Sequence, residues 1–140
     1  MSQILVVDDE AIITMQLEER LTEMGYSVSG MAASGEEAVE KARLTRPDVV
    51  LMDIVMPGKL NGIEAAKIIT EELDIPVVFV TAYADDSVVT SAKSVRPCGY
   101  IVKPFNELEL RATLESALSR KGTGKREKQE PDVIRNKNSR

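Results

Sequence analysis

Short apolar runs alternate with helical patterns along the first 119 residues. Five runs predict β-strands, because they are rich in branched apolar residues and bounded by turn or charged residues: Gln3–Val7, Ser27–Ala32, Val49–Met52, Val77–Thr81 and Tyr100–Val102. The third run is apolar throughout, which is typical of a strand buried on both faces.

A helical segment follows each strand. Ile13, Leu17, Leu21 and Met24 form an apolar stripe that ends at Gly25, a residue common just after helix C-termini. The other predicted helices span residues 34–46, 61–73 and 84–95 and begin again at 106, and capping-type sequences open three of these four.

Strict alternation of strands and helices predicts a doubly wound α/β fold, with a parallel sheet and helices on both of its faces. In such sheets the functional crevice lies at the carboxyl ends of the strands. We therefore look for chemistry at those ends.

Composition narrows the class of protein. The chain has 140 residues, 43% of them hydrophobic, which fits one globular domain. No apolar run approaches the roughly 18 residues that a membrane span needs, and the N-terminus lacks a basic leader. Cys98 is the only cysteine, so no internal disulfide can form. We expect a cytoplasmic protein.

The absence of histidine excludes several chemistries. Without His there is no Ser-His or Cys-His nucleophile pair, and a zinc site is equally hard to build with a single Cys. Any metal should be a hard cation held by oxygen. A phosphohistidine, if one takes part, must belong to a partner.

Charge divides the chain near residue 120. Residues 1–119 carry 10 Lys and Arg against 20 Asp and Glu, whereas residues 120–140 carry 8 against 3. We predict a domain over 1–120 and a basic, disordered tail or linker over 121–140. A solvated segment is the favoured interpretation of this tail, and contact with nucleic acid is the alternative.

Polar residues follow four of the strands. Asp8-Asp9, Asp53, Thr81 and Lys103 stand at the ends of strands one, three, four and five. Three converging carboxylates would repel one another unless a cation such as Mg²⁺ bound them. A carboxylate can then act as nucleophile and form an acyl phosphate, while Lys103 and Thr81 stabilise charge on the phosphoryl oxygens.

Each signal also has a purely structural interpretation. Asp8-Asp9 is a common N-cap pair, a Thr at a strand end reflects β-propensity, and Lys103-Pro104 suits a loop. Their joint occurrence at the correct strand ends favours a functional site.

The arrangement resembles the receiver domain of response regulators over about residues 3–119. The segments that carry the resemblance are Ile4–Glu10, Asp48–Gly58, Pro76–Ala82 and Gly99–Phe105. The resemblance implies a five-stranded sheet of order 2-1-3-4-5 flanked by five helices.

The resemblance also implies roles for matching residues. Asp53 matches the phosphorylated aspartate. Asp9 matches a direct ligand of Mg²⁺ (or Mn²⁺), Asp8 its neighbour that can act through water, and the backbone carbonyl of Val55 a third ligand.

Four further positions match the family's switch. Thr81 matches the hydroxyl that turns toward the phosphoryl group, and Lys103 the lysine that pairs with it, commonly before a cis proline, here Pro104. Tyr100 matches the aromatic residue that swings inward, which would shift the population of a surface formed by helix four, strand five and helix five.

Two features of the loops are particular to this chain. The segment from Asp53 to Gly62 is one residue longer than in most receivers, so the surface for a partner could differ. Val55 and Tyr83, two positions after Asp53 and Thr81, flank the path of hydrolytic water in receivers. Because neither offers a carboxamide or acid, we predict slow self-dephosphorylation.

The resemblance implies protein partners. A sensor histidine kinase or a histidine phosphotransfer protein would donate the phosphoryl group, and the switched surface would bind a downstream protein or a second copy in a phosphorylation-dependent homodimer. We expect the chain to catalyse only its own phosphoryl transfer and slow dephosphorylation, and not to act as an enzyme on other substrates. We expect no membrane association and no sequence-specific DNA binding within this chain. A stand-alone regulator and the receiver part of a longer protein both remain open.

Three rival functions fit less well. A haloacid dehalogenase-type phosphatase would want an acid at Val55. An unphosphorylated pseudo-receiver would be expected to lack one of the five site residues. An FMN-binding flavodoxin would not place Asp8-Asp9-Glu10 where a phosphate must bind.

Overall fold

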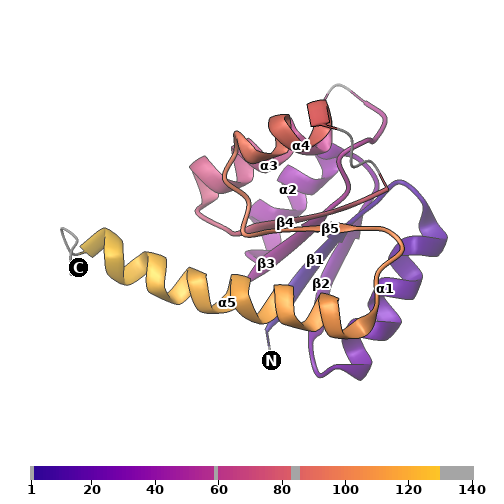
Figure 1. The fold of residues 1–140 in the computed structure, drawn as a ribbon, viewed down its shortest axis with the longest axis horizontal. Helices are drawn as coiled ribbons and strands as arrows, with labels where there is room; N and C mark the ends of the chain where they lie inside the picture. Colours follow the sequence, from indigo (N-terminus) through magenta and orange to yellow (C-terminus); the bar gives the residue numbers. More distant parts are fainter. Residues whose placement is uncertain (1, 59, 83–85, 130–140) are drawn as a thin grey trace.

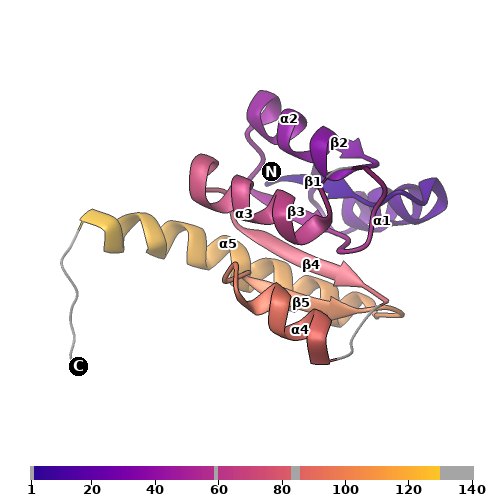
Figure 2. The same ribbon diagram turned by 90° about the horizontal axis from the view of Figure 1, so that it is seen from above.

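The five predicted strands form one parallel sheet of order β2-β1-β3-β4-β5 in the computed structural model, which describes residues 2–58, 60–82 and 86–129. The strands are β1 Gln3–Val7, β2 Ser27–Ala32, β3 Val49–Met52, β4 Val77–Thr81 and β5 Gly99–Val102. Figure 2 shows them side by side in this order. The predicted fold class and strand order are confirmed.

Helices connect the strands: α1 Ala11–Glu23, α2 Gly35–Thr45, α3 Gly62–Leu73, α4 Asp86–Lys93 and α5 Glu107–Gln129. The capping sequences act as predicted. The side chain of Ser34 accepts a hydrogen bond from Glu37 N–H at the start of α2, and Asn61 and Glu64 form a complete capping box on α3. Asn106 likewise accepts from Glu109 N–H at the start of α5.

The structure sets the bounds of the last two helices. α4 is described over Asp86–Lys93 rather than 84–95, and residues 83–85 lie outside the described part of the chain. α5 continues to Gln129, past residue 120. Residues 121–129 are part of this helix, although Gly122 and Gly124 have low helix propensity. Division of the chain at residue 120 stays a prediction.

Helices cover both faces of the sheet (Figure 1). α2, α3 and α4 pack on one face, where they bury residues such as Val39, Ile69 and Ala92 against Val50 and Phe79. α1 and α5 pack on the other face over a second cluster: Ile4, Val6, Leu17, Leu21, Val49, Leu51, Val78, Val80, Ile101, Leu110, Leu114 and Ala117. β3 is buried over its whole length, as its apolar sequence predicts.

None of the helices in the described ranges combines the length and the apolarity that a membrane-spanning segment requires.

Candidate phosphorylation site

The backbone hydrogen-bonding pattern of the sheet continues for one residue past the ends of β1, β3 and β5. Asp53 N–H donates to the Val7 carbonyl (2.9 Å), and Lys103 N–H donates to the Thr81 carbonyl (2.8 Å). Asp8 N–H donates to the Ala32 carbonyl (3.0 Å). These bonds hold the residues that follow β1, β3 and β5 in register, so their side chains meet at one edge of the sheet.

The three predicted carboxylates do meet there. Ligand oxygens of Asp8, Asp9 and Asp53 lie within 4.8 Å of one another. Asp8 and Asp53 are 3% and 7% exposed, whereas Asp9 is exposed to solvent. One oxygen of the group, Asp53 Oδ1, is buried and has no hydrogen-bond partner among the described residues.

This donor set fits a hard divalent cation. A buried carboxylate oxygen without a partner is costly unless something binds it, and an all-oxygen cluster open on the Asp9 side suits Mg²⁺, which keeps several waters. Asp8, Asp9 and Asp53 would supply the carboxylates.

Asp8 and Asp9 do not cap α1. The N-cap of that helix is Glu10, which makes no side-chain capping bond. Asp8 Oδ1 instead accepts from Glu10 N–H at 2.9 Å, which fixes the carboxylate in place. The structural interpretation of this pair as helix caps is therefore wrong, and both carboxylates remain available to the cluster.

Lys103 neutralises part of the cluster. Its Nζ lies 2.7 Å from Asp8 Oδ2 and 3.7 Å from Asp53 Oδ2. Burial by itself lowers the pKa of Lys103, but the hydrogen bond to Asp8 and the charges of Asp53, Asp8 and Glu10 outweigh it, so the pKa is raised. Lys103 is therefore held as a cation beside Asp53, and the bond before Pro104 is cis as expected.

Burial dominates the electrostatics of Asp53. It raises the pKa of this carboxyl; the charge of Lys103 lowers it, that of Asp8 raises it, and hydrogen bonds from Thr81 and Ile54 lower it, with a net rise. The surroundings therefore disfavour the ionised carboxylate, and a bound cation would stabilise it.

The two switch candidates occupy neighbouring strands. Thr81, at the end of β4, is fully buried. Tyr100, paired with Phe79 across the β4–β5 ladder, is half-buried, with its ring in edge contact with Phe79 at a centroid distance of 6.3 Å.

Of the two residues expected to influence hydrolysis, Val55 and Tyr83, the structure describes only Val55. Val55 is 47% exposed, between the buried side chains of Ile54 and Met56. Tyr83 lies outside the described residues.

Gly62 is a site residue that the sequence analysis missed. In the sequence it only marks the end of a longer loop, yet a Cβ at this position would collide with the Asp53 carbonyl oxygen and lie 2.7 Å from Ile54 Cα. Its N–H donates to the Ile54 carbonyl at 2.8 Å. Gly62 thus lets the start of α3 pack directly on the peptide of Asp53. Its spacing from Asp53 is the only signal that the sequence offers.

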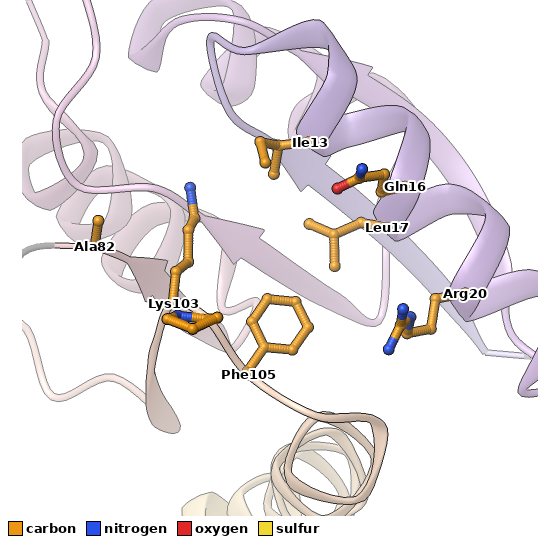
Figure 3. A pocket seen from close by; sticks show the side chains of 8 residues that line it. Ile13, Gln16, Leu17, Arg20, Ala82, Lys103 and Phe105 are labelled. Carbon is orange, nitrogen blue, oxygen red and sulfur yellow. The ribbon is translucent and has the colours of Figure 1, made fainter.

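A cleft of about 460 Å³ opens beside the cluster, between α1 and the segment after β5 (Figure 3). Its lining residues are Ile13, Gln16, Leu17, Arg20, Ala82, Lys103, Pro104 and Phe105. The Phe105 ring faces Leu17 across the cleft. Because Lys103 lines the cleft and also contacts Asp53, the cleft adjoins the acidic cluster.

Residues 4–115 match the response regulator receiver domain. A similar curated protein, the transcriptional regulatory protein PdtaR of Mycobacterium tuberculosis, is 42% identical over 118 residues, covering 84% of this chain and 57% of the relative. Transcriptional regulatory protein YvrH of Bacillus subtilis is 38% identical over 119 residues, covering 85% and 50%. The chain thus spans about half the length of these relatives.

Solved structures agree with the sequence matches. A signal receiver domain of a modulated diguanylate cyclase from Desulfovibrio desulfuricans superposes with a TM-score of 0.84 at 34% identity, covering 89% of this chain and 98% of that one. Chemotaxis protein CheY4 of Vibrio cholerae gives 0.76 at 33%, covering 84% and 99%. CheY of Borrelia burgdorferi, solved in a complex with CheX, BeF3 and Mg²⁺, gives 0.76 at 30%, covering 82% and 87%. The chain therefore belongs to the response regulator receiver family.

Proposed function

We propose that this receiver accepts a phosphoryl group on Asp53 from a histidine kinase or a histidine phosphotransfer protein, in a step that depends on Mg²⁺. The observation that carries the proposal is the convergence of Asp8, Asp9 and Asp53 within 4.8 Å, with Lys103 Nζ 3.7 Å from Asp53. The solved Borrelia complex with BeF3 and Mg²⁺ supports the same chemistry for a similar chain.

The chemistry follows from the groups at the sheet edge. An oxygen of Asp53 attacks phosphorus, the P–N bond of the donor phosphohistidine breaks, and the imidazole leaves as the acyl phosphate forms. Bound Mg²⁺ would neutralise charge on the phosphoryl oxygens. Asp8, Asp9 and Asp53, with the Val55 carbonyl, would hold it. Lys103 provides a positive charge beside Asp53, and positioning of this kind is the main source of catalysis in phosphoryl transfer.

The chain acts in this proposal as a phosphoacceptor and not as a turnover enzyme. Phosphorylation would draw Thr81 toward the phosphoryl group and let Tyr100 move inward, which changes the surface of α4, β5 and α5 for a downstream protein in the cytoplasm. The half-buried state of Tyr100 supports this, since part of its side chain is still exposed while its ring contacts Phe79.

The donor protein should dock over the cleft between α1 and the segment after β5. The imidazole of the donor must reach Asp53. Lys103 lines the cleft and also contacts Asp53, so a donor bound in the cleft would lie close to this residue. The apolar walls at Leu17 and Phe105 would accept apolar side chains of a donor helix.

Incubation with acetyl phosphate and MgCl₂, followed by intact mass spectrometry, tests the proposal. We expect a gain of one phosphoryl group in the wild type and none in Asp53→Asn or in the presence of EDTA. Asp74→Asn is the matched control, because Asp74 is exposed and follows α3 at the opposite end of β4. Absence of a gain with every phosphodonor, or an equal gain in Asp53→Asn, would refute the proposal.

The lifetime of the acyl phosphate gives a separate prediction. Val55 is exposed beside the site and offers no group to orient water, so we expect slow hydrolysis in the wild type and faster loss in Val55→Asn, by about tenfold or more if the carboxamide acts as a water-orienting group. The decay of the phosphorylated mass after removal of the donor measures it. Decay of Val55→Asn at the wild-type rate contradicts the prediction.

A further inference from the structure

The loop that follows Asp53 is anchored in the core at its beginning. Ile54 and Met56 are 4% and 9% exposed and belong to the cluster under α2 and α3. Val55 lies between them with an exposed side chain. The backbone at Val55 is thus held on the core side by its two neighbours.

The same loop then rests on the first turn of α2. Gly35, the first residue of that helix, is so close to Leu60 that a Cβ there would lie 2.5 Å from the Leu60 carbonyl oxygen and 2.8 Å from its Cβ. Such separations do not occur between real side chains and backbone. The close approach of loop and helix therefore requires glycine at position 35.

A second contact joins the loop to the same turn. Gly58 has a φ of 102°, a conformation that favours glycine, and a Cβ built on it would lie 2.8 Å from Glu36 Oε1. The carboxylate of Glu36 therefore lies directly against the backbone of Gly58.

The turn that carries Gly35 and Glu36 is itself fixed. Ser34 Oγ accepts from Glu37 N–H at 3.2 Å, and Glu37 Oε1 accepts from Ala33 N–H at 2.8 Å. The latter bond is the largest reason that the pKa of Glu37 is lowered. The two bonds, one to Ser34 and one from Ala33, fix the conformation of the helix start on which the loop rests.

We propose that the first turn of α2 positions the loop after Asp53 for metal binding, with Gly35 as the positioning residue; the inference rests on the proposed function. Asp8 and Asp53 directly follow strands and are held by backbone bonds of the sheet, and Asp9 is the next residue after Asp8. The Val55 carbonyl is the one ligand that belongs to the loop. A displaced loop would therefore weaken Mg²⁺ binding while leaving the carboxylates in place.

Calorimetric titration of the full chain with MgCl₂ tests this role. In Gly35→Ala the added methyl group must push Leu60 away, and we expect Mg²⁺ affinity to fall by about tenfold, the lower end of the effect of residues that support metal ligands. Gly30→Ala is the matched control, because a Cβ there meets Leu5 Cδ1 at an ordinary 3.6 Å. It should bind Mg²⁺ as the wild type does.

Leu60→Ala covers the case in which Gly35→Ala does not fold. Leu60 is half-buried against the core cluster, so its truncation loosens the loop from the other side without a clash, and Mg²⁺ affinity should again fall. In both variants acetyl phosphate should label Asp53 slowly at low Mg²⁺ and at nearly the wild-type rate when Mg²⁺ is saturating.

The outcomes separate the inference from the function on which it rests. Wild-type Mg²⁺ affinity in the folded variants, with or without a lower Tm, would overturn the positioning role and leave the phosphoacceptor role intact. A wild-type chain that neither binds Mg²⁺ nor gains a phosphoryl group would instead refute the proposed function.

Discussion

Burial of Asp53 disfavours the ionised carboxylate that its proposed function requires. Its carboxyl is buried, and its Oδ1 has no partner among the described residues. Lys103 offsets only part of the cost, because its closer contact is with Asp8 at 2.7 Å. The ionised Asp53 side chain is therefore a source of instability in the metal-free domain and, in the proposed function, a ligand for a cation.

The raised pKa of Asp53 predicts how the stability of the metal-free domain varies with pH. A folded-state pKa above the unfolded value means that the folded state binds the proton more tightly, so the free energy of unfolding falls as pH rises from the ordinary carboxyl pKa through the raised one. Below that window Asp53 causes no penalty. Asp53→Asn should therefore raise Tm in EDTA at pH 7 and change it less near pH 4.

Thermal unfolding of both proteins in EDTA across this pH range checks the prediction. Added Mg²⁺ should narrow the difference, because the cation stabilises only the wild-type carboxylate. A lower Tm for Asp53→Asn than for the wild type at pH 7 in EDTA would contradict the sign of the effect.

Gly62 predicts a steric effect beside Asp53. A methyl group at this position meets the Asp53 carbonyl oxygen and Ile54 Cα, which are backbone atoms that cannot rotate away. We expect Gly62→Ala to lower the free energy of unfolding by roughly 2–4 kcal/mol, in the upper range for single substitutions. Urea unfolding measures this loss.

Urea unfolding of a second glycine variant serves as the control for Gly62→Ala. Gly30→Ala adds a methyl group in ordinary contact and should be neutral or slightly stabilising, because it restricts the unfolded chain. A similar loss in both variants would show that the effect comes from glycine replacement in general.

The starts of α2 and α3 support the loop that follows Asp53. α2 begins under the loop that follows Asp53, and α3 begins on the peptide of Asp53 itself. The capping box on α3 joins Asn61 Oδ1 to Glu64 N–H (2.9 Å) and Glu64 Oε1 to Asn61 N–H (3.0 Å). The end of the loop is therefore fixed by bonds within four residues of sequence.

Removal of this cap should weaken α3. Asn61→Ala loses the acceptor for Glu64 N–H, and we expect a loss of about 1–2 kcal/mol in the free energy of unfolding. Asn61→Ser keeps a capping oxygen and should stay close to the wild type. Chemical denaturation of the two variants distinguishes them, and equal losses would rule out capping as the cause.

The whole molecule is stabilised by two apolar clusters on either side of the sheet. α5 contributes Leu110, Leu114 and Ala117, which are all fully buried. These residues precede position 119, although the helix itself continues to Gln129 and extends away from the sheet in Figure 1. The contacts that join α5 to the domain, among residues whose side chains are described, therefore end before the basic segment.

A chain ending at residue 119 should consequently retain the fold. We expect its free energy of unfolding to change by less than about 0.5 kcal/mol, as for most surface changes, and acetyl phosphate to label Asp53 at the same rate. Thermal unfolding and intact mass measure both quantities. A large drop in stability would place residues 120–129 within the folded domain.

The pattern of the amino-acid sequence predicted the strands and the residues at the sheet edge, whereas the strand order came from the resemblance to receivers. Periodicity marks the elements because burial repeats every two residues in a strand and about every 3.6 in a helix. Asp8, Asp9, Asp53, Thr81 and Lys103 could be placed together because parallel strands end at one edge. The resemblance to receivers then supplied their roles.

Only the tertiary structure decided how these residues meet. Whether Asp8 caps α1 or pairs with Lys103 depends on a contact between residues 95 positions apart, and no local pattern encodes that distance. Gly35 and Gly62 likewise read as ordinary helix-start residues until the loop after Asp53 is packed on them. Periodicity reports which way a side chain faces; the atoms that it meets are set by the packing of distant segments.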